Sequence, residues 1–193
     1  MTPESEKESS NPDSLGRRLE QGEKIPTQRR EPVDCGHYGI RIARDGNWYY
    51  RGSRINRKPL VTLFSSVLYR DDAGIFWLRT PAEKGLIDVD DAPFVGVELQ
   101  VSGNGAEQEL SVRTNIDEIV AIDGDHPLRV VINPATGEPS PYIIVRDRLD
   151  ALIARSVYYE LAELGVDGPQ GGFGVWSHGI FFVLGDIGEA DEI

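Results

Sequence analysis

The chain of 193 residues contains one cysteine, Cys35, and no apolar stretch long enough to cross a lipid bilayer. A single cysteine excludes an internal disulfide and every metal site built from several cysteines, and it is typical of the reducing cytoplasm. Residues 1–12 have no apolar core, so we expect neither a secretory signal nor a membrane-spanning helix. We therefore expect a cytoplasmic protein, and no motif in the sequence indicates a cofactor.

Positive charge is also scarce. The chain has 20 Lys and Arg residues against 32 Asp and Glu residues, which gives a formal net charge of −12 at pH 7. Phosphate backbones bind to basic faces, so this charge argues against a nucleic-acid partner. The length allows one or two domains with a buried core.

Changes in composition divide the chain into four parts. Residues 1–34 are rich in Ser, Glu and Pro, and we expect a disordered tail and linker with a short helix over residues 14–21. We expect an N-terminal α+β domain over residues 35–82 and a C-terminal domain over residues 83–186, with the boundary at Pro81-Ala82-Glu83. An acidic tail follows over residues 187–193.

A β-β-α-β pattern occurs twice, which predicts an α+β fold with a duplicated core. Simple binary patterning could also produce this match. If the duplication is real, Arg41 and Arg129 occupy equivalent places in the two copies. The first copy has strands at Ile40–Ile42, Trp48–Tyr50 and Gly74–Leu78 and a helix capped by Asn56; the second has strands at Leu128–Val130 and Gly179–Val183 and a helix over Asp150–Leu164 capped by Asp150.

The remainder of the C-terminal domain alternates apolar and polar residues, for example over Phe94–Val101 and Glu109–Arg113. This alternation is typical of antiparallel strands with one solvated face. Gly103-Asn104-Gly105 and Ser177-His178-Gly179 are the expected hairpin turns. We expect a curved antiparallel sheet or barrel of about seven strands with one helix packed on it.

Several short motifs are spread along the chain in a fixed order. They include Arg41-Ile42-Ala43-Arg44-Asp45-Gly46, Trp48-Tyr49-Tyr50, Asp91-Ala92-Pro93-Phe94, Asp125-His126-Pro127-Leu128-Arg129, Arg155-Ser156-Val157-Tyr158-Tyr159 and Gly174-Val175-Trp176-Ser177. With these motifs the chain resembles an uncharacterised bacterial family known as domain of unknown function 1285. The resemblance implies a duplicated core and a C-terminal domain superficially like a pleckstrin-homology barrel. It also implies a pocket for a nucleotide-like ligand at the domain interface and a role in signal transduction.

Four arginines are the candidate ligand-binding residues: Arg41, Arg113, Arg129 and Arg155. Guanidinium groups bind phosphate and carboxylate in a bidentate manner, so a converging set would suit a small anion. Tyr158 and Trp176 would form the apolar walls of such a site, and His126 is a further candidate ligand-binding residue. The alternative is that each arginine forms a structural ion pair and that the aromatic residues belong to the core.

The candidate catalytic residues are His126 with Asp125, on a tight turn, and Cys35 with His37 nearby. The turn could run acid–base chemistry or hold a metal, and an imidazolium could activate the thiol. The structural alternative is a turn in which Asp125 accepts backbone N–H groups, and a partly buried thiol. No further metal ligands occur at a suitable spacing, so we expect no metal site.

We therefore expect a binding or sensor module for a small anionic, nucleotide-like ligand between two domains. The alternatives are a hydrolase or transferase that uses His126 and Asp125, or Cys35, and a scaffold that binds a protein partner.

Overall fold

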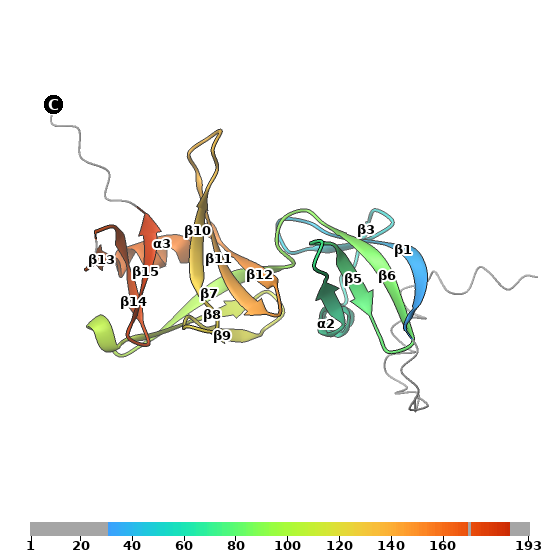
Figure 1. The fold of residues 1–193 in the computed structure, drawn as a ribbon, viewed down its shortest axis with the longest axis horizontal. Helices are drawn as coiled ribbons and strands as arrows, with labels where there is room; N and C mark the ends of the chain where they lie inside the picture. The colour runs from blue at the N-terminus through green and yellow to red at the C-terminus, as the bar shows by residue number, and fades with distance from the viewer. Residues whose placement is uncertain (1–30, 170, 186–193) are drawn as a thin grey trace, which may run out of the picture. The chain divides into compact units, whose positions relative to one another are not determined.

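The computed structural model describes residues 31–169 and 171–185. The helix expected over residues 14–21 and the acidic tail over residues 187–193 lie outside the described residues. The chain divides into two compact units, one that ends at Asp91 and one that begins at Ala92. Figure 1 shows the elements of each unit, coloured along the chain.

The first unit is a six-stranded sheet with the strand order β3-β2-β1-β6-β5-β4. The two central strands, β1 and β6, run parallel, and the other neighbours are antiparallel. The elements are β1 (Val33–Ile42), β2 (Trp48–Tyr50), β3 (Ser53–Arg54), α2 (Lys58–Ser66), β4 (Leu68–Arg70), β5 (Phe76–Arg79) and β6 (Glu83–Val89).

Helix α2 packs against the sheet through aromatic residues, because the fully buried rings of Trp48 and Phe64 stack with their centroids 6.2 Å apart. The helix begins at Lys58, and a proline in its first turn suits the position where no N–H donor is needed. Its N-cap is Arg57, which makes no capping hydrogen bond through its side chain. The expected cap at Asn56 is therefore wrong by one residue.

Strand β6 places the division between the units later than the expected boundary at residues 81–83. The strand pairs with both β1 and β5, so residues 83–89 complete the first sheet. Strand β1 begins at Val33, which brings residues 33 and 34 into the sheet rather than into a linker.

The second unit contains a six-stranded sheet with the order β10-β11-β12-β7-β8-β9 and a small sheet with the order β13-β14-β15. The larger sheet is not wholly antiparallel, since β12 and β7 run parallel. The elements are β7 (Phe94–Ser102), η1 (Gly105–Glu107), β8 (Glu109–Thr114), β9 (Ile119–Ala121), β10 (Leu128–Ile132), β11 (Pro139–Arg146), β12 (Leu149–Ile153), α3 (Arg155–Glu163), β13 (Val166–Asp167), β14 (Phe173–Ser177) and β15 (Ile180–Gly185).

The second helix begins later than the sequence predicts. Residues 149–153 form strand β12, in which Leu149, Ala151 and Ile153 are buried and the intervening side chains are not. This alternation has the two-residue period of a strand. The helix expected from Asp150 is therefore wrong over residues 150–153, and Ala154 is the N-cap of α3.

Both expected turns of the second unit are confirmed. The turn over Gly103-Asn104-Gly105 joins β7 to β8, and Ser177 pairs with Ile180 across the turn that joins β14 to β15. Within the described residues, neither helix is long and apolar enough to cross a membrane.

The duplication of the core is confirmed, but the repeated unit is a six-stranded sheet rather than the predicted β-β-α-β unit. Helix α2 follows β3 whereas α3 follows β12, so the two helices are not at equivalent places. Adding six to each strand number of the first sheet gives β9-β8-β7-β12-β11-β10, which is the order of the second sheet read from its other edge. The parallel pair is central in both sheets. Strand β1 therefore corresponds to β7, and β4 corresponds to β10. Arg41 lies on β1 and Arg129 on β10, so the two arginines are not at equivalent places.

Candidate functional site

Arg41, on β1, forms a bidentate ion pair with Asp90. Its Nε lies 2.7 Å from Oδ1 of Asp90, and its Nη2 binds the other carboxylate oxygen. The neighbouring Arg44 pairs with Asp91 at 3.1 Å. Hydrogen bonding to Arg41 lowers the pKa of Asp90. Both arginines thus hold the last residues of the first unit in place.

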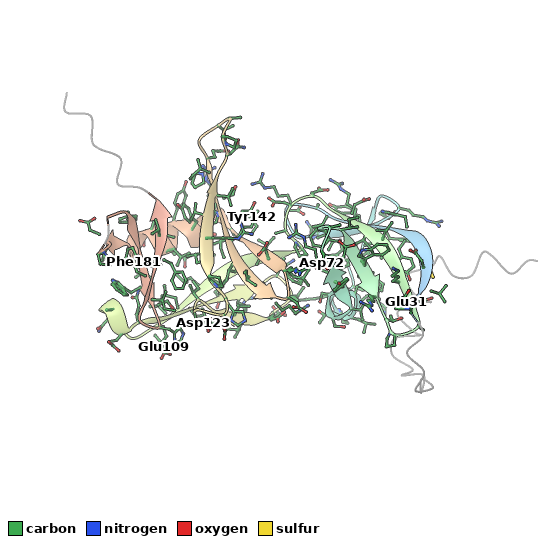
Figure 2. All side chains as sticks on the ribbon, in the orientation of Figure 1. Glu31, Asp72, Glu109, Asp123, Tyr142 and Phe181 are labelled. Carbon is green, nitrogen blue, oxygen red and sulfur yellow. The ribbon has the colours of Figure 1, made fainter. Side chains whose placement is uncertain are left out.

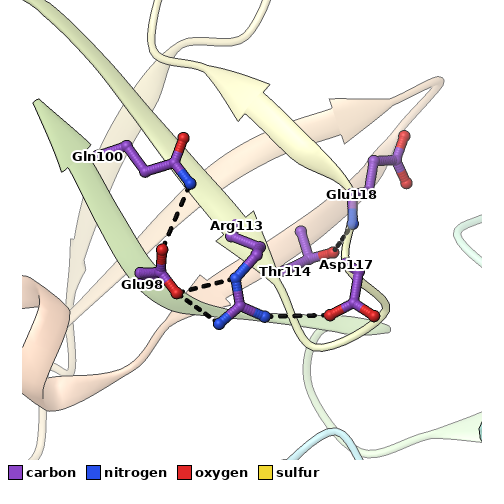
Figure 3. A network of polar contacts seen from close by, with 6 residues as sticks. All are labelled: Glu98, Gln100, Arg113, Thr114, Asp117 and Glu118. Carbon is purple, nitrogen blue, oxygen red and sulfur yellow. Dashed lines mark hydrogen bonds and ion pairs between the residues drawn. The ribbon is translucent and has the colours of Figure 1, made fainter. Parts of the chain in front are cut away.

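Arg113, on β8, is engaged by two carboxylates. Its Nε and Nη2 donate to the same oxygen of Glu98 at 2.9 and 2.5 Å, and its Nη1 lies 3.1 Å from Asp117 (Figure 3). Gln100 donates to the other oxygen of Glu98 at 3.3 Å. Hydrogen bonding to Arg113 lowers the pKa of Glu98. The guanidinium is therefore part of a closed surface network.

Arg129 pairs with Asp150 at 2.7 Å and stacks over the Tyr142 ring at 4.8 Å. Its strand, β10, is separated from the strand of Arg113 by three others in the sheet, and the two arginines pair with different carboxylates. Arg155, at the start of α3, is exposed; it hydrogen-bonds Tyr159 at 3.1 Å and lies 3.9 Å from Glu138. The structure does not bring these arginines of the second unit together.

Tyr158 and Trp176, the expected apolar walls, take part in the packing of the second unit. The Tyr158 hydroxyl donates to the carbonyl oxygen of Leu184 at 2.9 Å, and burial raises its pKa. The Trp176 ring meets Phe181 edge to face at 5.3 Å. The Trp176 carbonyl accepts from the Gln108 side chain at 2.8 Å.

His126 lies in a turn organised by Asp123 rather than by Asp125. One carboxylate oxygen of Asp123 accepts the backbone N–H groups of Asp125 and His126 at 2.9 and 2.8 Å, and the His126 ring lies 3.1 Å away. Burial alone would raise the pKa of Asp123, but these hydrogen bonds lower it. No group of His, Cys, Asp and Glu side chains in the described ranges could hold a metal ion.

Cys35 is exposed, and its Sγ lies 3.7 Å from a carboxylate oxygen of Glu83. The nearby His37 is engaged elsewhere: its Nδ1 accepts the backbone N–H of Gly39 at 2.9 Å, and its Nε2 lies 3.3 Å from Asp88. Each ring nitrogen of His37 thus has a partner other than the thiol.

A different set of side chains lines a hollow of about 230 Å³ on the first sheet. We call these five residues of β4, β5, β6 and the β4–β5 turn the aromatic platform: Tyr69, Asp71, Trp77, Arg79 and Lys84. Glu31, the first described residue (Figure 2), and Pro32 complete the lining.

The strand register explains why these side chains share one face. Tyr69 lies opposite Trp77, and Arg79 lies opposite Lys84. Trp77 and Arg79 are two residues apart on β5, so both project from the same side of the sheet. The intervening Leu78 is buried on the other side.

Two cations of the platform lie over its two rings. The Lys84 ammonium is 4.7 Å from the centre of the Trp77 ring, and the Arg79 guanidinium is 5.4 Å from that of Tyr69. Neither cation has an ion pair with a carboxylate of residues 31–169 or 171–185, although Glu31 lines the same hollow. The rings therefore hold both cations without neutralising them.

A carboxylate lies at the other end of the aromatic pair. The backbone N–H of Asp71 donates to the carbonyl oxygen of Ile75. Ile75 precedes Arg79 by four residues, which in an extended chain is a distance of about 13 Å. Its Oδ2 accepts the indole N–H of Trp77 at 2.9 Å. This bond, followed by backbone N–H bonds, lowers the pKa of Asp71. Asp71 and Lys84 thus both contact Trp77, while Arg79 lies over Tyr69.

Sequence reasoning missed the platform because it assigned residues 74–78 to a core strand. The signal was present: Tyr69 and Trp77 lie at matched distances on either side of a turn that ends in Gly74, whose φ is 84°. A hairpin centred on this turn places the two rings side by side.

Comparison with known families and structures identifies relatives of the chain. Residues 25–92 match the N-terminal domain of unknown function DUF1285, and residues 93–184 match the C-terminal domain of the protein of unknown function DUF1285. A search of curated proteins gives no match.

Two crystal structures of DUF1285 family proteins are similar to the chain. The protein from Silicibacter pomeroyi DSS-3 is 40% identical, with a TM-score of 0.81 over 93% of this chain and 97% of its own. The protein from Shewanella baltica OS155 shares the fold at 24% identity, with a TM-score of 0.51 over 65% of this chain and 91% of its own. Because both domain models and a 40% identical structure cover most of its length, the chain belongs to the DUF1285 family.

Proposed function

We propose that this protein binds a small anionic ligand that carries a planar ring, a nucleotide-like chemistry, and that the aromatic platform holds it. The observation that supports this proposal is the pair of cations, Arg79 and Lys84, held over two rings in a hollow without a carboxylate partner from the described residues. Guanidinium and ammonium groups bind phosphate or carboxylate, and the edges and faces of Tyr69 and Trp77 suit a planar ring.

The opposite charges of the platform favour a ligand that carries both an acidic group and a hydrogen-bond donor. An acidic group would bind Arg79 and Lys84, while an amine or hydroxyl donor would bind Asp71. The hollow, at about 230 Å³, is smaller than the pockets of roughly 300 Å³ and more that hold drug-sized ligands, so a mononucleotide is near the upper limit. Binding without turnover fits a sensor role in signal transduction.

The test is an NMR titration of the full chain with phenyl phosphate, which combines a ring with a phosphate, and with adenosine monophosphate. The protein has three indole N–H groups, of which Trp77 is on the platform, Trp48 is in the core and Trp176 is in the second unit. We expect the Trp77 resonance to move with either probe and the Trp48 and Trp176 resonances to remain in place.

The matched variants replace arginine and lysine by glutamine. Arg79→Gln combined with Lys84→Gln should weaken binding about tenfold or more, because hydrogen bonds to charged groups are lost. Arg129→Gln, a cation over a ring in the second unit, should leave the Trp77 response unchanged. A folded wild-type protein whose Trp77 resonance is unmoved at about 10 mM of both probes, a concentration that detects very weak binding, contradicts the proposal.

A further inference from the structure

The duplication supplies an internal comparison for the aromatic platform. Strands β4, β5 and β6 correspond to β10, β11 and β12, and the same sequence of buried and outward-facing pairs occurs in both sets. The equivalent pairs are Leu68–Leu78 and Leu128–Ile143, Tyr69–Trp77 and Arg129–Tyr142, and Leu78–Gly85 and Ile143–Ala151.

The match fixes which residue of the second unit corresponds to Lys84. Along β6, buried Glu83, Gly85 and Ile87 alternate with half-buried residues, and along β12 buried Leu149, Ala151 and Ile153 do the same. Lys84 precedes Gly85, and Asp150 precedes Ala151. Lys84 in the first unit and Asp150 in the second therefore occupy equivalent positions.

The change of sign at this position alters the whole platform. In the second unit Arg129 stacks over Tyr142, which is labelled in Figure 2, and its guanidinium lies 2.7 Å from Asp150. An acidic group of the protein itself thus binds the cation over the ring. In the first unit the equivalent position has a cation, Lys84, which lies over Trp77, the counterpart of Tyr142. Arg129 takes the place of Tyr69, and Ile144 takes the place of Arg79. The second copy therefore has one cation over its ring, and Asp150 binds that cation.

We infer that the residue at this equivalent position determines which copy of the platform binds an external anion. Lys84 adds a cation to the first copy, which can then bind the anion, whereas the Asp150 carboxylate already binds the cation of the second copy. This inference rests on the proposed function for its ligand class, namely a small phosphate or carboxylate with a planar ring. The Asp150 carboxylate occupies the place on Arg129 that the acidic group of such a ligand would take. The protein then has one anion site for two copies of the same sheet.

The experiment exchanges the charges one position at a time and titrates each folded chain with phenyl phosphate. In the wild type we expect a response at the Trp77 indole and none at the Tyr142 amide. Lys84→Asp should weaken the Trp77 response about tenfold or more, since it removes one charged donor and supplies a competing carboxylate. Asp150→Lys should create a response at Tyr142.

Asp150→Asn is the second variant, because it frees Arg129 without placing two cations together. It should give a weaker response at Tyr142 than Asp150→Lys gives. Binding at Trp77 that Lys84→Asp changes by less than about twofold, a small fraction of one charged hydrogen bond, overturns the inference. So does a silent Tyr142 in both folded Asp150 variants. A silent Trp77 in the wild type instead contradicts the proposed function, and the Asp150 variants still test the second copy.

Discussion

The backbone N–H of Leu110 donates to the hydroxyl oxygen of Ser177, and the two atoms lie 3.0 Å apart in the buried interior of the second unit. This bond joins β8 of the larger sheet to β14 of the small sheet. Ser177→Ala should lower the free energy of unfolding by about 1–3 kcal/mol, because the Leu110 N–H is left buried without an acceptor. Urea unfolding measures this change. Ser102→Ala, at an exposed strand end, is the control, and equal effects of the two substitutions would contradict the structural role of Ser177.

Gly174 lies under the neighbouring strand. A Cβ atom at this position would be 2.1 Å from the carbonyl oxygen of Phe182, and a backbone atom inside a sheet cannot move away easily. Gly174→Ala should therefore destabilise the protein by about 1–3 kcal/mol or more. At Gly124 the nearest atom to an added Cβ is Ile180 Cδ1 at 3.5 Å, an ordinary contact. Thermal unfolding of both alanine variants should show a large decrease in Tm for Gly174 alone.

Asp71 should make stability depend on pH. Its folded-state pKa is lowered, chiefly by the hydrogen bond from the Trp77 indole and then by backbone N–H groups. The unfolded chain therefore binds a proton first, so the stabilisation is present above the ordinary aspartate pKa and is lost as pH falls through the lowered folded-state pKa. Asp71→Asn should flatten this dependence in urea unfolding. Trp77→Phe should raise the pKa of Asp71 in an NMR titration, and an unchanged pKa would mean that the indole is not the main cause.

We expect the Tyr158 phenol to lose its proton at a higher pH than an ordinary tyrosine. Burial raises the pKa of its phenol above the ordinary value, and its hydroxyl donates to the Leu184 carbonyl oxygen at 2.9 Å. The neutral phenol is thus favoured in the folded state, and the associated stability is lost as pH rises through the folded-state pKa. Tyr158→Phe should remove one late step from the ultraviolet titration of the tyrosines and cost about 0.5–1.5 kcal/mol for the lost hydrogen bond. The exposed Tyr159, replaced in the same way, serves as the control.

Local patterns predicted several strands and turns of this protein, but not β3, β4, β12 or β13. The strand over residues 48–50 is confirmed at both ends, and the hairpin turn at His178 and Gly179 follows from two residues with positive φ. Residues 149–154 were harder, because a short apolar run next to a helix suits either a helix or a strand. Pairing with β7 on one side and β11 on the other decides for a strand, and this pairing is tertiary information.

The candidate site depended even more on partners that are distant in the sequence. Each arginine chosen from the sequence has a carboxylate neighbour, at Asp90, Glu98, Asp150 and Glu138. Because the chain has 32 acidic residues, the sequence alone did not indicate which arginines would form ion pairs with carboxylates. Arg79 and Lys84 stand out only when the register places them over Trp77 and Tyr69.

In each six-stranded sheet the central parallel pair joins the strand that comes first in the sequence to the strand that comes last. In the first unit the meanders β1-β2-β3 and β4-β5-β6 consist of contacts close in sequence, which form quickly, whereas β1 must wait for β6. During synthesis the first sheet cannot close until Val89, the last residue of β6, has left the ribosome, so the meander β1-β2-β3 has an unpaired edge at β1 until then. Closure between β1 and β6 is therefore expected to be the slow step in folding of the first unit, and between β7 and β12 in the second.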